Sequence, residues 1–282
     1  MARKIITDEL KDEIIEFYLS KPMSLKEVQD KYNLCGPTIS KILKDIPKYT
    51  KAKIKNPNLN ERFFQNIDSE EKAYFLGLLI ADGNVFVKES SANRQASISI
   101  TLDLKDEYML LKFKEVLGAS TNVGYDGRGC GQIAVRSDLM AQDLSNYGVI
   151  PRKSFATYLP NVDEKLIPHL LRGILDGDGS IQAHQHGGKF LHDISYCGTH
   201  QLMQDISDIS AKILHLNYKP VVYDYHDKNL SEIKFKNIDD MLNFGNWLYE
   251  NATIYLIRKY EKFTTFKEHY KLMQENAEIT KP

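Results

Sequence analysis

Two segments of the sequence each end in an aspartate followed by a glycine, Asp82-Gly83 and Asp178-Gly179. Each aspartate closes an apolar stretch that predicts a buried helix, so its carboxylate falls on the last helical turn. There the carboxylate meets the negative end of the helix dipole, and two such helices packed side by side would also bring two negative charges together. A divalent cation relieves both conflicts, because Mg²⁺ and Mn²⁺ prefer carboxylate and water ligands. We therefore predict a metal site on Asp82 and Asp178.

The two segments belong to an internal repeat. Residues 75–83 (FLGLLIADG) correspond to residues 171–179 (LRGILDGDG), and the offset of 96 positions also aligns Ile98-Ser99 with Ile194-Ser195. A single Asp-Gly pair is equally well explained as a helix stop that leads into a turn. Two copies of it in a repeat favour a functional site instead.

Small residues in both copies predict that the two helices touch. Gly77 and Ala81 are four positions apart, as are Gly173 and Gly177. This spacing puts each pair on one helix face, where small side chains let two helix backbones approach closely. Glycine inside a helix costs about 1 kcal/mol relative to alanine, so its presence indicates a tight helix–helix contact. We expect Asp68 to cap the first of these helices.

Each copy predicts the order helix, two strands, helix, two strands, helix. Residues 96–102 alternate apolar and polar side chains, a helix follows at about 106–117, and further strands are expected at 122–125 and 132–136. The second copy repeats this order, with a helix near 202–214 and a hairpin over 221–236. The expected fold class is α+β.

The first 46 residues predict a small all-α domain. Helices are expected at 8–19 and 25–32, and Gly36-Pro37 opens a third. This pattern is typical of a helix-turn-helix, whose third helix enters the major groove; Thr38, Ser40 and Lys41 would then contact DNA. The alternative is a small helical bundle that binds protein or has no binding partner. A basic linker follows, in which Lys51 and Lys53 either lie along phosphates or are simply solvated.

The repeated segments resemble the LAGLIDADG motif of homing endonucleases. Ile80 departs from the motif at a position where the family often has an acid, and Asp176 keeps that acid. The resemblance implies that Asp82 and Asp178 are the catalytic metal ligands, and Ala81 and Gly177 before them complete the expected metal site. It also implies Mg²⁺ as cofactor, with Mn²⁺ able to substitute and Ca²⁺ able to bind without cleavage.

The resemblance further implies a monomer with pseudo-twofold symmetry and saddle-shaped antiparallel sheets. Such a chain would cut both strands of a specific DNA target and would be encoded by an intron or another mobile element. The expected domains are a helix-turn-helix at 1–46, a linker at 47–62 and repeats at 63–160 and 161–282. The family also uses basic residues near its metals. Matched positions in the two copies make Lys153 and Lys259 the candidates, with ordinary surface lysines as the alternative.

The polar face of each sheet is expected to lie on DNA and to read base edges. The candidates on strands are Ser97, Ser99, Gln132, Arg136, Lys189, Lys234 and Lys236, and those in loops at strand ends are Arg94, Arg128, Gln182, His184, Gln185 and His186.

The amino-acid composition is compatible with DNA binding but does not by itself indicate it. The chain of 282 residues has a net charge of −1, so a DNA interface must rest on local patches rather than on overall charge. Three distant cysteines and no secretory signal favour an intracellular protein, cytoplasmic or nucleoid-associated. Two alternatives are a transcription regulator derived from the same fold and an RNA maturase that assists intron splicing.

Overall fold

The computed structural model describes residues 6–20, 25–44, 56, 58–88, 95–151, 157–225 and 230–279. The chain divides into two compact units, residues 1–57 and 58–282. Among the described residues, no helix combines the length and the apolar character that crossing a membrane requires. The predicted contacts at Lys51, Lys53, Arg94 and Lys153 lie outside the described residues.

The described residues of the first unit form the helices α1 (Asp8–Ser20), α2 (Leu25–Tyr32) and α3 (Gly36–Ile42). The turn between α2 and α3 contains Asn33 with φ of 50°, a left-handed conformation that asparagine tolerates better than most residues. Proline in the first turn of α3 costs no hydrogen bond there, since the amides of that turn have no partner within the helix. The helices enclose a core of their own, made by Ile14, Tyr18, Val28, Tyr32, Ile39 and Leu43.

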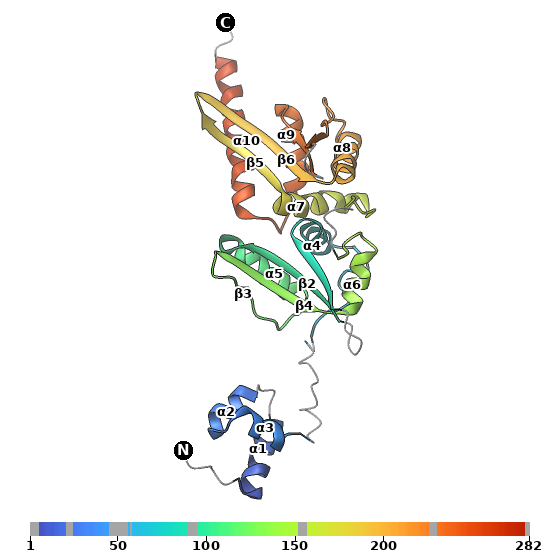
Figure 1. The fold of residues 1–282 in the computed structure, drawn as a ribbon. Helices are drawn as coiled ribbons and strands as arrows, with labels where there is room; N and C mark the ends of the chain where they lie inside the picture. The colour runs from blue at the N-terminus through green and yellow to red at the C-terminus, as the bar shows by residue number, and fades with distance from the viewer. Residues whose placement is uncertain are drawn as a thin grey trace. The chain divides into compact units, whose positions relative to one another are not determined.

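The second unit contains two four-stranded antiparallel sheets with the same strand arrangement (Figure 1). Sheet A has the order β1-β2-β4-β3, with strands β1 (Gly83–Lys88), β2 (Gln95–Asp103), β3 (Gly124–Tyr125) and β4 (Cys130–Arg136). Sheet B has the order β5-β6-β8-β7, with strands β5 (Gly179–His186), β6 (Lys189–Gly198), β7 (Tyr223–Tyr225) and β8 (Leu230–Phe235).

Helices cover one face of each sheet. The helices α5 (Glu107–Val116) and α6 (Asp138–Ser145) pack on sheet A, and α8 (His200–Leu214), α9 (Ile238–Tyr249) and α10 (Ile257–Ile279) pack on sheet B. The strand pattern explains this arrangement, because alternate residues such as Ile98, Ile100 and Val135 are buried on the helix side. The opposite face of each sheet carries the polar residues.

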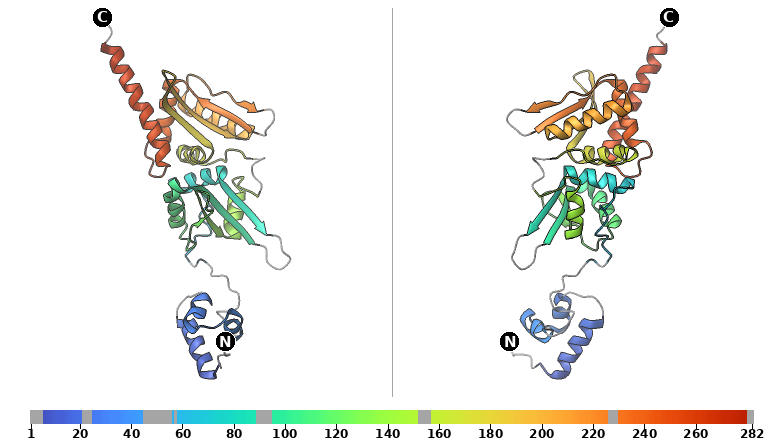
Figure 2. Two further views of the ribbon diagram at one scale, coloured as in Figure 1. Left: turned by 60° about the vertical axis from the view of Figure 1, so that its left-hand side comes forward. Right: turned by 90° about the vertical axis from the view of Figure 1, so that its right-hand side faces the viewer.

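Two helices lie side by side between the sheets, α4 (Glu70–Ala81) and α7 (Ile167–Asp178) (Figures 1 and 2). Both are buried along nearly their whole length, as their apolar sequences require. One continuous core runs through them and through both sheets.

The predicted elements are present in the predicted order, with local differences at the cap of α4, in one strand and at the C-terminus. The N-cap of α4 is Ser69 rather than Asp68: its side chain accepts from the Lys72 N–H, whereas Asp68 forms an ion pair with the Lys72 ammonium at 2.8 Å. The strand expected at 122–125 is shortened to Gly124–Tyr125. The long helix α10 was not predicted.

Candidate active site

The α4–α7 contact is too close for any side chain at two of its glycines. A Cβ built on Gly77 would lie 2.1 Å from the Leu170 carbonyl oxygen, and one built on Gly173 would lie 2.0 Å from the Tyr74 carbonyl oxygen. The two backbones therefore touch directly, as the small-residue spacing predicted. This contact fixes the two helices relative to each other.

The predicted aspartates lie at the same end of this helix pair. Asp82 is the C-cap of α4, where its amide bonds the Leu78 carbonyl, and Asp178 is the last residue of α7. A Cβ built on Gly177 would lie 2.3 Å from Ala81 Cβ and 3.2 Å from Asp82 Oδ2. The Asp82 carboxylate thus lies against the last turn of α7, next to the residue that precedes Asp178. Both aspartates are exposed.

The donor set suits a hard divalent cation. Two carboxylates at two negative helix ends favour a positive charge between them. The described residues contain no group of three or more His, Cys, Asp or Glu side chains that could hold a metal. A cation here would therefore take the two carboxylates together with backbone carbonyls, water or substrate oxygens, which is the ligand chemistry of Mg²⁺ rather than of zinc.

Lys259, the predicted catalytic lysine, is buried at the same helix end. It is 3% exposed, and its ammonium donates to the backbone carbonyls of Leu175, Asp176 (2.8 Å) and Gly179 (2.8 Å). Burial lowers the pKa of Lys259 from 10.5 to about 8, although the charges of Asp176 and Asp82 act in the opposite direction. All three donor positions of the ammonium are directed at the C-terminal turn of α7. These contacts hold the turn that carries Asp178.

Asp176, the acid that the first copy replaces with Ile80, is fully buried beneath this turn. Its Oδ2 accepts from the Tyr74 hydroxyl at 2.7 Å and from the Leu256 amide at 2.8 Å, while Oδ1 has no hydrogen-bond partner among the residues that the structure describes. Burial raises the pKa of Asp176, and the nearby Lys259 charge opposes that rise. Asp176 therefore joins α4, α7 and the segment before α10, and it is not exposed to substrate.

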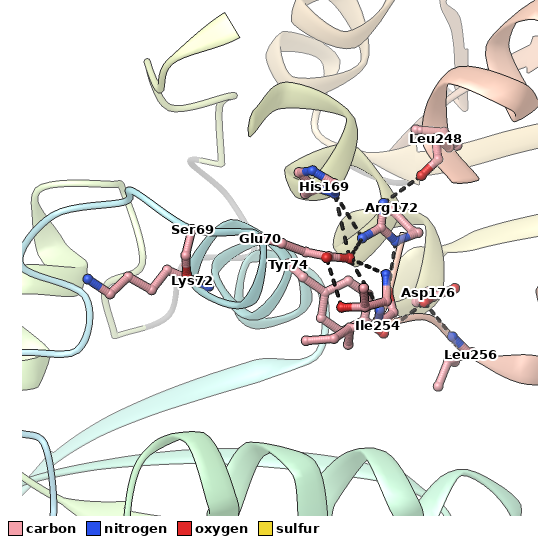
Figure 3. A network of polar contacts seen from close by, with 11 residues as sticks. Ser69, Glu70, Lys72, Tyr74, His169, Arg172, Asp176, Leu248, Ile254 and Leu256 are labelled. Carbon is pink, nitrogen blue, oxygen red and sulfur yellow. Dashed lines mark hydrogen bonds and ion pairs between the residues drawn. The ribbon is translucent and has the colours of Figure 1, made fainter. Parts of the chain in front are cut away.

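Figure 3 shows a second buried group that sequence analysis missed, centred on Arg172. The Arg172 side chain is fully buried and donates to the carbonyls of Ile254 (2.7 Å) and Leu248 (2.5 Å) and to the Glu70 carboxylate. An arginine within the apolar run of residues 170–175 was the available signal. Glu70 and Arg172 tie α4 and α7 to the C-terminal part of the chain.

The strand register of sheet A places the predicted polar residues on one face. Ser97 pairs with Arg136, and Gln132 pairs with Thr101, to which its amide donates at 2.9 Å. Ser99 shares this face but is only 7% exposed, because it lies on the central strand between Asn84 and Ala134. The burial of Ser99 therefore argues against direct contact between its side chain and a base.

In sheet B, four residues predicted in loops lie in β5 instead: Gln182, His184, Gln185 and His186. Gln185 pairs with Phe190 and shares the helix side with Ala183 and Ile181, so its side chain does not belong to the polar face. The strand β5 continues further than expected, so its regular alternation turns Gln185 toward the helix side.

Basic and acidic groups are mixed on the polar face of sheet B. Lys234 forms an ion pair with Glu232 at 2.9 Å, and Asp193 of β6 pairs with Gln182 of β5. Lys189 is exposed at the start of β6, and Lys236 is exposed just after β8. In sheet A, Arg128 lies in the expected turn with an exposed side chain near Asp126. The acids Glu232 and Asp193 were not predicted on this face.

In the first unit, the predicted contacts lie on the short third helix. Lys41 is exposed, and Thr38 and Ser40 are half-buried. The Thr38 hydroxyl lies 3.0 Å from the Cys35 thiol at the N-cap of α3. Lys41 is thus the most accessible of the three.

Comparison with known proteins finds similarity in structure alone. No protein-family model and no curated protein matches the sequence. The chain is similar to I-SmaMI bound to an uncleaved DNA target in the presence of calcium ions, with a TM-score of 0.51, 14% identity, and coverage of 76% of this chain and 94% of that one. It is also similar to the LAGLIDADG meganuclease I-AabMI bound to uncleaved DNA, with a TM-score of 0.53, 12% identity, and coverage of 74% and 93%. The part of this chain that contains the two sheets therefore has the fold of the LAGLIDADG homing endonucleases.

Proposed function

We propose that this protein is a site-specific double-strand DNA endonuclease of the LAGLIDADG homing type. One observation carries the proposal: a glycine contact between α4 and α7 brings Asp82 and Asp178 to the same exposed helix end. The shared fold supports it, since I-SmaMI and I-AabMI are both known bound to DNA.

Asp82 and Asp178 would hold Mg²⁺, together with the backbone carbonyls of Ala81 and Gly177. The bound cation would stabilise the charge that develops on phosphodiester oxygens and would activate the attacking water. The chain's own contribution is to fix both carboxylates on rigid helix ends before the metal arrives, which lowers the cost of organising the site. Lys259 holds the last turn of α7 and adds a buried positive charge nearby. Lys153 would be its counterpart in the first repeat.

The polar faces of the two sheets would lie in successive stretches of the major groove. Sheet A would contribute Ser97, Gln132 and Arg136, and sheet B would contribute Gln182, His184, His186, Lys189, Lys234 and Lys236. We propose that the repeats, 63–160 and 161–282, form a pseudo-twofold monomer, in which each sheet reads one half of the target. The strand order that the two sheets share supports this.

The first unit would be a helix-turn-helix that adds affinity without chemistry. Residues 1–57 form a compact unit with a hydrophobic core of its own, which supports an independent role. Deletion of residues 1–57 should weaken DNA binding and reduce its dependence on salt concentration, because fewer phosphate contacts release fewer counterions. The position of the cut should not change. Equal affinity in the truncated and full-length proteins would rule out this role.

The nuclease is tested by selecting cleaved sites from a randomised duplex library, with Mg²⁺ or with EDTA. Asp82→Asn and Asp178→Asn should each lower double-strand cleavage by about 100-fold or more, because the metal loses a ligand. DNA affinity and thermal stability should be preserved, since each substitution removes a charge that the helix end disfavours. Glu115→Gln, at an exposed position on α5, is the control and should cut like the parent.

Scoring supercoiled plasmid as intact, nicked or linear separates two mechanisms. A shared metal would make each single variant inactive on both strands, whereas independent metals would make each variant a nickase. Equal cutting in EDTA, or tight sequence-specific binding without any cutting, would contradict the nuclease proposal. The second result would instead indicate a DNA-binding regulator.

A further inference from the structure

Residues 253–259, which comprise the end of the connection from α9 and the first turn of α10, contact elements from both repeats; we call this segment the C-terminal strap. Its first two residues bind Glu70 at the N-terminus of α4. The Glu70 carboxylate accepts from the Thr253 amide at 2.7 Å, the Thr253 hydroxyl at 2.8 Å and the Ile254 amide at 3.2 Å. Arg172 donates to the same carboxylate (Figure 3). The start of the strap is therefore held by the half-buried Glu70 carboxylate, which is paired with the fully buried Arg172.

The middle of the strap binds the start of α5. The Tyr108 hydroxyl accepts from the Ile257 amide at 2.7 Å and donates to the Tyr255 carbonyl at 3.3 Å. The Arg258 guanidinium donates to the Asp106 carboxylate at 2.8 Å. Asp106 is 2% exposed, so its charge depends on this partner. Residues of the first copy thus hold a segment of the second copy.

The end of the strap reaches the catalytic end of α7. The Leu256 amide donates to Asp176 Oδ2 at 2.8 Å, and the Lys259 ammonium donates to three carbonyls of the last turn and its exit. A flexible lysine side chain can bond to many positions, so the ammonium keeps all three of these bonds at once only while its backbone stays within reach of the three carbonyls. The adjacent Arg258–Asp106 pair supplies that restraint.

We propose that Asp106, Tyr108 and Arg258 are positioning residues, which fix the strap so that Lys259 holds the last turn of α7, and with it Asp178, in place for cleavage. The inference rests on the proposed nuclease function. DNA cleavage, which uses Asp178 of the second repeat, would then depend on side chains of the first repeat.

The test compares Arg258→Gln with the same substitution in a matched ion pair that lies outside the strap. Arg62 and Asp143 are joined at 2.7 Å with side chains 45% and 6% exposed, against 2.8 Å and 39% and 3% for Arg258 and Asp106. Both Arg258→Gln and Arg62→Gln leave a buried aspartate without its partner, so their melting temperatures should fall by similar amounts. Only Arg258→Gln should lower the single-turnover cleavage rate, by about 10- to 100-fold, because displacements near 1 Å have effects of this size.

Two further measurements identify the cause. DNA affinity in Ca²⁺ should be unchanged, and amide hydrogen exchange over residues 175–179 should rise in Arg258→Gln but not in Arg62→Gln. If Arg258 acts through Lys259, adding Arg258→Gln to Lys259→Met should cause no further loss of rate. Tyr108→Phe, which removes one hydroxyl, serves as a second variant if Arg258→Gln does not fold, and it should raise the same exchange rates.

Equal rate losses in the two arginine variants, or unchanged exchange over residues 175–179, would overturn the inference. A parent protein that cuts no DNA would refute the proposed function instead. The exchange comparison would then still decide whether the strap holds the end of α7.

Discussion

Replacing Gly173 with alanine should separate the two central helices. The new Cβ would lie 2.0 Å from the Tyr74 carbonyl oxygen and 2.9 Å from the Leu78 amide nitrogen. Ordinary contacts begin at 3.4 Å, so α4 and α7 must move apart by about 1.4 Å at this point to restore van der Waals distance. Backbone atoms cannot rotate away as a flexible side chain can.

The energetic balance is unfavourable despite the better helix propensity of alanine. Alanine gains about 1 kcal/mol over glycine in a helix, while overpacking of a well-packed core costs about 3 kcal/mol at the upper end of its usual range. The net loss of about 2 kcal/mol corresponds to a fall in Tm of about 4–8 °C for a domain of this size. A displacement near 1 Å should also lower the cleavage rate by about 100-fold.

Thermal melts and single-turnover cleavage of the selected target measure both effects. Leu144→Ala, at a fully buried position on α6, is the control: it should lose about 2–5 kcal/mol through a cavity but leave α4 and α7 in contact. This control should melt at a lower temperature than the parent but cut at the parent's rate once folded. A Gly173→Ala protein that cuts as fast as the parent would refute the claim that the backbone contact sets the distance between the carboxylates.

Two further predictions concern the same helix ends. Gly177→Ala alone should reduce the cleavage rate and the melting temperature, because its Cβ would lie 2.3 Å from Ala81 Cβ. The double variant with Ala81→Gly has one methyl group at this contact and should restore both properties, as measured by plasmid cutting and thermal melting. Because of Lys259, the free energy of unfolding should increase with pH in the alkaline range. The pKa of Lys259 is about 8 in the folded protein and lies below its ordinary value of 10.5. Between these pH values the unfolded chain binds more protons than the folded one, so the free energy of unfolding rises by about 3 kcal/mol across the range. The free energy of unfolding of the parent, minus that of Lys259→Met, should therefore increase from pH 8 to 10; a constant difference would refute the lowered pKa.

The candidate metal site was predicted from local features of the sequence. Asp82 and Asp178 stand at matched places in a repeat, and the spacing of Gly77 and Gly173 within it indicated that the two helices touch. Strand alternation likewise predicted which residues of sheet A share a face. These features are local, because helix and strand periods depend only on residues a few positions apart. The one-residue error at the α4 cap arose because Asp68 and Ser69 are both suitable capping residues.

Tertiary structure alone decided which groups support the aspartates. Lys259 meets the end of α7 more than 80 positions away in sequence, and Asp106 meets Arg258 across 152 positions. Nothing in the local pattern distinguishes such a lysine from a solvated one, since its burial depends on how α10 and the strap return to the helix pair. Ser99 and Gln185 show the same limit. Their residue types suit a DNA contact, but the neighbouring strands and the extent of β5 determine what each side chain can reach.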